Sequence, residues 1–432
     1  MTSMPSPRSR RILFSVLAAV LALLAVELVA SIGIGAIHGH WFDLTPFGDR
    51  RRLLIGAGPD AAPTAGPRPG FVEMAAMHPF VGYVVDPVRS ESELSDFGYY
   101  EYERPLFERS EDTVILAVFG GSFAHQFRES AIHAVIDGLA KDPAFRGKEF
   151  VVTSTALGGY KQPQQLMTLN YLLALGGEFD IVVNIDGFNE VAIHQAENRA
   201  RNVFPAYPRS WYYHTMGLSD PAFVEKSAEV IRIRTRRRAS ATFFSGWPWR
   251  VSATANLIWS VRDQGRQADL LSTRAELEAY QTSAERYVAT GPAFDQTDDA
   301  RVFGEIASIW ERSSLQMARL ARANGIVYVH ALQPNQYLEG SKPLSEEEQS
   351  VAFDPRHKYR VGVAAGYPLL IEAGRRLSES DVNFLDWTNA YENVRESLYV
   401  DTCCHVNARG NELLVDDLVG AILDGRRDLA RD

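Results

Sequence analysis

Cysteine is almost absent from this sequence. Its 432 residues include only two cysteines, Cys403 and Cys404, and these are adjacent. A disulfide between neighbouring residues is strained and uncommon, so the pair excludes a fold held together by disulfides and leaves the redox compartment open. No cysteine and histidine spacing is typical of zinc, and we expect no metal. We expect the two cysteines to be packing residues rather than nucleophiles.

The chain also lacks an excess of positive charge and any internal repeat. Its 44 lysines and arginines are outnumbered by 54 acidic residues, which gives a net charge of -10. Nucleic-acid-binding proteins usually present a basic surface, so we expect no nucleic-acid partner. A composition of 46% hydrophobic and 23% charged residues is that of a globular protein with a substantial core. The length allows one large domain or two ordinary ones.

One long apolar segment lies near the start of the chain. Arg8, Arg10 and Arg11 precede an almost uninterrupted apolar run over residues 12–37. About 20 apolar residues span a bilayer, and basic residues before the run predict a cytoplasmic N-terminus over residues 1–11. A cleaved signal peptide is the alternative, but the run is longer than a usual signal core. We therefore expect a single-pass anchor in a bacterial-type inner membrane, with the remaining chain on the extracytoplasmic side.

A single carboxylate, Glu27, interrupts the apolar run. A carboxylate inside a membrane is unfavourable unless it is protonated or paired. Glu27 is therefore either a tolerated defect or a contact for another helix, which a membrane protein partner could supply.

Residues 38–70 follow the apolar run, and their proline, glycine and alanine predict a linker.

Residues 71–425 are the predicted main domain. Short strands and loops begin it, and strands then alternate with helices, a pattern typical of a parallel sheet with helices on both faces. The predicted strands cover residues 114–119, 150–156, 179–185, 325–332 and 382–385. The predicted helices cover residues 123–139, 163–175, 301–323, 361–377 and 410–423.

Residues 191–298 interrupt this alternation. They are rich in tryptophan and tyrosine, contain a basic run over Arg232–Arg238, and have long helical segments. We interpret them as a helical insertion, which would form a lid over the site. The basic run could meet anionic lipid head groups or an acidic glycan, or it could be a solvated helix face.

A serine lies where the first strand of the predicted sheet ends. Ser122 follows the apolar strand and two glycines, and a helix begins after it. Ligands of open α/β sheets bind at this edge, and the helix N-terminus favours negative charge. Ser122 is thus either the N-cap of the helix or a nucleophile. The capping-box position three residues later holds His125, which could also be a rival base.

Three later loops carry residues that suit acyl transfer. Ser122 would attack a carbonyl carbon, His405 would accept its proton, and Asp401 would orient the imidazole. The backbone N–H groups of Ser122 and Gly159 and the side-chain amide of Asn189 would bind the oxyanion. In a parallel sheet these strand ends converge at one edge.

With these residues in place, the chain resembles the SGNH or GDSL-like hydrolase family. That resemblance covers roughly residues 71–423 and implies a three-layer, flavodoxin-like α/β fold without an organic cofactor. The family has four short blocks in a fixed order. They are matched by Phe119–Phe123, by Gly159, by Gly187–Glu190, and by Asp401 and His405 with Asn407 and Gly410.

Three positions depart from the family's pattern. The family usually has Asp before its Ser, where this chain has Gly121, and Asp after its Asn, where this chain has Glu190. Its Asp usually lies three residues before its His, where this chain has Thr402. Asp401 lies one residue further away, so the loop must bulge, and Asp386 is the fallback partner for the histidine.

A second serine-hydrolase fold remains as an alternative. Gly120–Ala124 approximates the Gly-x-Ser-x-Gly elbow of α/β-hydrolases. In that family several strands precede the elbow, whereas here the serine follows the first convincing strand. Asp401 and His405 in one short loop also favour the SGNH-type arrangement.

The resemblance and the anchor together predict a membrane-anchored serine esterase. Its expected substrate is an ester-linked acyl group, preferably an O-acetyl group on an envelope or exported glycan, with lipid esters second. An O-acyltransferase using the same residues is chemically close. A non-catalytic subunit of a membrane assembly is the alternative from another class, favoured by the widened Asp–His spacing and by Glu27.

Overall fold

The computed structural model divides the chain into two compact units. We call residues Met1–Arg68 with Gly217–Ser283 the helical unit, and Pro69–Met216 with Ala284–Asp432 the sheet unit. The structure describes residues 7–39, 43–56, 75–86, 94–100, 106–212, 214–215, 221–282, 291, 294 and 296–429. The proline-rich part of the predicted linker, residues 57–70, lies outside these ranges.

The sheet unit contains a five-stranded parallel sheet with strand order β4-β3-β5-β6-β7. Its strands are β3 (Thr113–Gly120), β4 (Glu149–Ser154), β5 (Ile181–Asp186), β6 (Val327–Leu332) and β7 (Phe384–Asp386). The second strand along the chain lies outside the first, and the remaining three follow in sequence, which is the flavodoxin-like order. The predicted α/β class and parallel sheet are confirmed.

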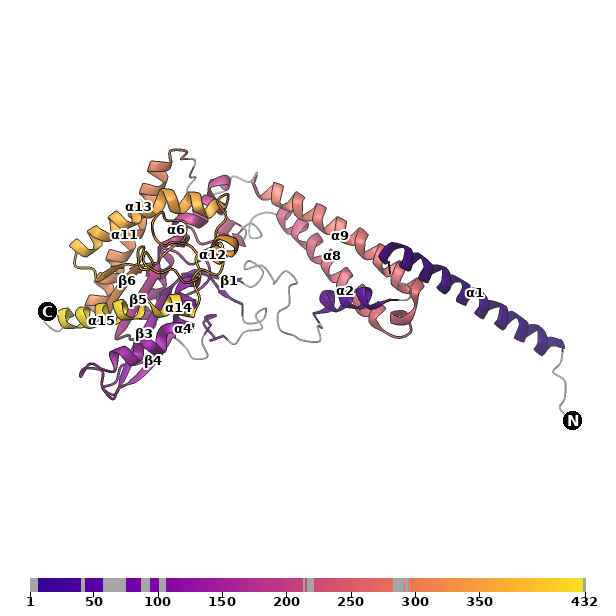
Figure 1. Ribbon diagram of the computed structural model, residues 1–432, viewed down its shortest axis with the longest axis horizontal. Coiled ribbons are helices and arrows are strands. Elements are labelled where there is room, and N and C mark those ends of the chain that lie inside the picture. The colour runs from indigo at the N-terminus through magenta and orange to yellow at the C-terminus, as the bar shows by residue number, and fades with distance from the viewer. Residues whose placement is uncertain are drawn as a thin grey trace. The chain divides into compact units, whose positions relative to one another are not determined.

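Helices cover both faces of this sheet (Figure 1). They include α4 (Ser122–Leu139), α5 (Gln164–Ala174), α11 (Asp299–Ala323), α13 (Lys358–Glu379) and α15 (Val415–Leu429). Alternate residues of β3 enter different cores: Val114 and Val118 pack with α4 and α15, whereas Ile115 and Phe119 pack with α5, α11 and α13. Because both faces are covered, the central strands are apolar throughout rather than alternating.

Shorter elements complete the sheet unit. They are the antiparallel pair β1 (Ala75–His78) and β2 (Gly82–Val85), α6 (Phe188–Ile193), η1 (His194–Asn198), η2 (Arg199–Arg201), α12 (Glu346–Val351) and α14 (Ala408–Glu412). The single last helix predicted over residues 410–423 is wrong, because α14 and α15 are separate. Leu414, fully buried in the core, occupies the turn between them.

The helical unit contains α1 (Pro7–His38), α2 (Thr45–Ile55), α8 (Pro221–Ser245), η3 (Trp249–Val251) and α9 (Ala253–Thr282). Helices α8 and α9 lie side by side as a hairpin (Figure 1). Within α1, Phe14–Ala36 is long and apolar enough to cross a membrane, with 23 residues and a mean hydropathy of 2.5. Helix α2 lies in the stretch predicted as linker; it has a proline in its first turn and ends at Gly56 with a φ of 78°.

Candidate active site

Ser122 lies at the carboxyl end of β3, at the first residue of α4. Gly120 makes the turn with a φ of 139°, and a Cβ there would lie 2.1 Å from the carbonyl oxygen of Ile185. Gly121 is the N-cap residue, and no side chain caps the helix. The alternative that Ser122 serves as the N-cap is therefore wrong, and its hydroxyl is available for another contact.

The hydroxyl of Ser122 meets the imidazole of His405. The Ser122 Oγ lies 2.8 Å from His405 Nε2, and His405 Nδ1 lies 2.5 Å from Asp401 Oδ2. The loop that carries both residues is closed by an antiparallel bridge between Tyr399 and Val406. Serine, histidine and aspartate thus form an unbroken chain of hydrogen bonds between α4 and the C-terminal loop.

The Asp401 carboxylate also organises its own loop. Its Oδ1 accepts the backbone N–H groups of Cys403 at 2.9 Å, Cys404 at 3.2 Å and His405 at 3.3 Å. The main chain curves around this oxygen. The curve makes room for the one extra residue between Asp401 and His405, compared with the spacing in the family. Asp386, the fallback partner, instead accepts the backbone N–H and hydroxyl of Thr388.

Hydrogen bonding also sets the protonation of Asp401. Burial alone would raise the pKa of this carboxyl, but the hydrogen bonds from His405 and from the N–H of Cys403 outweigh it and lower the pKa below its ordinary value. Asp401 is therefore ionised at neutral pH, as required to hold a histidine in one tautomer. His125, the rival base, pairs with Glu129 at 3.5 Å and contacts the ring of Tyr100.

Asn189 lies against the serine turn. Its Nδ2 donates to the carbonyl oxygen of Tyr160 at 2.8 Å, and a Cβ on Gly121 would lie 2.3 Å from the same nitrogen. Gly159, which directly precedes Tyr160, has a φ of 82°. Among the described residues, the backbone N–H groups of Ser122 and Gly159 have no hydrogen-bond partner. These groups are the donors that the sequence predicts for an oxyanion.

The buried carboxylate of Glu190, to which the sequence assigned no contact, joins two of these loops. Glu190 accepts the backbone N–H of Gln162 at 2.8 Å and that of Gly187 at 3.0 Å. Burial, together with the nearby Asp186, raises the pKa of Glu190, and burial lowers the pKa of the neighbouring Lys161 despite the attraction of Glu190. Glu190 therefore fixes the loop after β4 against the loop after β5.

A second polar cluster lies beneath the site. Asp186 Oδ1 accepts the indole N–H of Trp310 at 2.6 Å and lies 2.8 Å from His330 Nε2, and its Oδ2 accepts the amide of Asn184 at 2.7 Å. The signal in the sequence was the presence of Asn184, Asp186 and His330 inside otherwise apolar strands. Buried polar groups persist when they are hydrogen-bonded, as here.

The adjacent cysteines are free thiols with their Sγ atoms 3.4 Å apart. Together with His405 they could bring three ligand atoms within 4.8 Å of one another. Both ring nitrogens of His405 are already engaged, and burial raises the pKa of the Cys404 thiol well above its usual value. Because a metal ligand must be a thiolate, this set fits a metal poorly.

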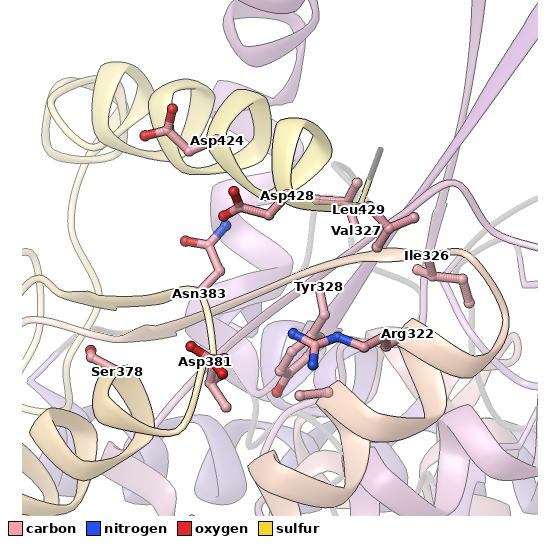
Figure 2. A pocket seen from close by; sticks show the side chains of 13 residues that line it. Arg322, Ile326, Val327, Tyr328, Ser378, Asp381, Asn383, Asp424, Asp428 and Leu429 are labelled. Atoms are coloured by element: carbon pink, nitrogen blue, oxygen red, sulfur yellow. The ribbon is translucent and has the colours of Figure 1, made fainter. Parts of the chain in front are cut away.

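A groove lined by described residues lies elsewhere. It has a volume of about 510 Å³ and lies between α11, α13 and α15, with Val327 and Asn383 on its floor (Figure 2). These residues lie at or before the amino ends of β6 and β7. Ser122 follows the carboxyl end of a parallel strand, so the groove and the serine lie at opposite edges of the sheet.

Several solved structures match this chain. A GDSL-like lipase from Bacteroides thetaiotaomicron VPI-5482 aligns with a TM-score of 0.31 and 12% sequence identity, over 73% of this chain and 89% of that one. No family model matches the sequence, and no curated protein matches it.

Proposed function

We propose that this chain is a serine esterase of the SGNH type, anchored in a bacterial-type inner membrane with its sheet unit on the extracytoplasmic side. The observation that carries the proposal is the hydrogen-bonded series from Ser122 Oγ through His405 to Asp401. A serine linked to a carboxylate through an imidazole is the arrangement that activates a hydroxyl for acyl transfer.

The reaction follows from the positions of these groups. Ser122 Oγ attacks the carbonyl carbon of the ester while its proton passes to His405 Nε2. The oxyanion is held by the N–H groups of Ser122 and Gly159 and by the amide of Asn189. When it collapses, His405 returns the proton to the leaving alcohol, and the acyl group stays on Ser122. Water, deprotonated by the same imidazole, then releases the acid.

The substrate class follows from the expected location. An anchor that places the sheet unit outside the cytoplasmic membrane gives it access to acylated glycans of the envelope or of export, and O-acetyl esters are our preferred substrates. Acylated lipids are second. If a sugar hydroxyl replaces water in the last step, the same residues make a glycan O-acyltransferase.

Hydrolysis by the full-length protein in detergent tests the proposal. With p-nitrophenyl acetate we expect turnover that Ser122→Ala abolishes and that Ser350→Ala, at an exposed serine on α12, leaves unchanged. Adding a glycan acceptor then separates esterase from transferase by the appearance of acetylated glycan. Turnover by Ser122→Ala at the wild-type rate would contradict the proposal.

A further inference from the structure

Glu27, the carboxylate within the apolar helix α1, has its partners at the turn of the α8–α9 hairpin. Its Oε1 accepts the hydroxyl of Ser252 at 2.6 Å, and its Oε2 accepts the backbone N–H of Ala253 at 2.7 Å. These groups begin α9, where free N–H groups and the helix dipole favour a negative charge. Glu27 of α1 therefore caps the N-terminus of α9. The start of α9 lies beside Glu27, at the same height along the axis of α1.

Glu27 lies inside the apolar span of α1, Phe14–Ala36. The 15 residues from Ile12 to Val26 extend only about 22 Å as a helix, less than the ~30 Å of a bilayer's hydrocarbon core. If α1 crosses a bilayer, Glu27 must lie below the surface, about 14 Å along the helix from Ala36. The start of α9 lies at the same depth.

The surface of the hairpin turn is apolar where a soluble protein would be polar. Trp247 is 78% exposed, Val251 60% and Phe243 57%, and Trp249 stacks on Phe243. Leu28 of α1, next to Glu27, is also exposed. Exposed aromatic and aliphatic side chains grouped in this way mark a surface that contacts something apolar.

Three charged side chains of this unit, those of Arg51, Arg237 and Asp263, are buried. Arg51 is buried, and its Nη1 donates to Asn256 Oδ1 at 2.5 Å while its guanidinium lies over the ring of Trp259. Asp263 is also buried and accepts two hydrogen bonds from Arg237, at 2.8 and 3.1 Å. Ionisable residues that face the inside of a helix bundle, with apolar residues outside, are typical of a membrane-embedded segment.

The turn of the α8–α9 hairpin has few charged residues, and a basic run lies next to it. Residues 239–261, which include the turn, contain one charged residue, Arg250. The basic run Arg232–Arg238 directly precedes them. Basic residues next to an apolar segment are placed to meet anionic lipid head groups, and a long side chain such as that of Arg250 can extend toward them.

We propose that the turn of the α8–α9 hairpin is a second membrane contact, in which residues 243–251 enter the hydrocarbon of the outer leaflet beside α1. The basic run Arg232–Arg238 would lie among the lipid head groups. The inference rests on the proposed anchoring of α1 and does not depend on the esterase chemistry. It makes the helical unit a membrane-embedded base built from two distant parts of the chain.

Spin-label accessibility on the full-length protein in phosphatidylcholine and phosphatidylglycerol vesicles tests this. In a Cys403→Ser and Cys404→Ser background, a nitroxide is attached at Trp247→Cys or Val251→Cys. Val20→Cys, within α1, serves as the membrane reference, and Ser272→Cys, exposed further along α9, as the aqueous reference. Collisions with oxygen report contact with lipid, and collisions with a nickel chelate report contact with water.

We expect the labels at positions 247 and 251 to lose nickel collisions to the level of position 20, and to keep oxygen collisions, while position 272 behaves as in water. Nickel collisions at 247 and 251 equal to those at 272, with position 20 protected, would overturn the inference and leave the anchor intact. Loss of both oxygen and nickel collisions at 247 and 251 would show a protein partner and overturn the lipid contact. Water-like behaviour at position 20 would overturn the anchor itself, and the inference with it.

Discussion

Asp401 is the residue whose position the sequence made least certain. It lies one residue further from His405 than the resemblance requires, yet its Oδ2 reaches His405 Nδ1 at 2.5 Å. Its other oxygen accepts three consecutive backbone N–H groups, so the carboxylate is both the partner of the histidine and the centre of the loop. Sequence spacing alone cannot show this, because the bulge depends on hydrogen bonds from the main chain.

Replacing this carboxylate tests its part in the reaction. In Asp401→Asn we expect kcat to fall by about 10²–10⁴-fold, because the amide cannot hold the imidazole in the tautomer that accepts the serine proton. Asp386→Asn, which removes the fallback partner bonded to Thr388, should change kcat by less than about threefold. A large loss in Asp386→Asn with little in Asp401→Asn would reverse the assignment.

The lowered pKa of Asp401 also predicts how stability depends on pH. A carboxyl whose folded pKa lies below its unfolded value adds stability above the unfolded pKa, and loses it as the pH falls through the folded value. The difference in free energy of unfolding between wild type and Asp401→Asn should be constant from roughly pH 5 to pH 8 and shrink below about pH 4. Denaturant titrations across this range would measure it, and a difference that grows toward acid pH would contradict the assignment.

At the scale of elements, the contact between two loops shapes the site. Gly121 in the turn after β3 leaves room for the amide of Asn189, which follows β5. In Gly121→Ala, the added Cβ would displace this amide, and we expect kcat to fall by about 10²–10³-fold, as on loss of one oxyanion donor. Gly304→Ala, on α11, is the matched control, because the added Cβ would meet no other atom within 4 Å. Unchanged activity in a folded Gly121→Ala would exclude Asn189 from the site.

The strands around the site could be predicted because a sheet covered on both faces has continuous apolar strands, and its helices could be predicted from the apolar face that each turns to the sheet. Ser122 and Asn189 could be predicted as well, because polar residues after buried strands stand out, whereas His405 was predicted from its place beside Asp401 in one short loop. The contact that Glu190 makes between the two loops could not be predicted, because its partners are the backbone N–H groups of Gln162 and Gly187, which every residue except proline carries. Helix α2 was missed because its short sequence, with glycine and three arginines, has little apolar pattern.

At the scale of the whole molecule, the helical unit combines two segments that are far apart in the sequence, Met1–Arg68 and Gly217–Ser283. We predicted an insertion over residues 191–298, whereas the segment that joins the N-terminal helices in one compact unit is Gly217–Ser283. Packing of Ala30 and Ile34 of α1 against Ala241 of α8 and Ala253 of α9 joins these distant segments. No local pattern reveals such pairing. The prediction that the insertion is a lid stays a prediction, as does a membrane protein partner at Glu27.

Fractionation of cells tests the proposed location. We expect the full-length protein to stay with membranes through an alkaline carbonate wash, because the apolar helix cannot leave the bilayer without exposing its side chains. Protease added to spheroplasts should remove an epitope tag placed after Asp432 while leaving a cytoplasmic control protein intact. Protection of the tag in intact spheroplasts, with loss only after lysis, would place the sheet unit on the other side.

The most direct measurement of the central claim is covalent labelling of the full-length protein with a fluorophosphonate, followed by mass spectrometry of its peptides. The probe reacts with a serine only when a neighbouring base activates it. We predict an adduct on Ser122, lost in Ser122→Ala and strongly reduced in His405→Ala. A folded wild-type protein that takes up no probe, or an adduct that persists in Ser122→Ala, would contradict the account.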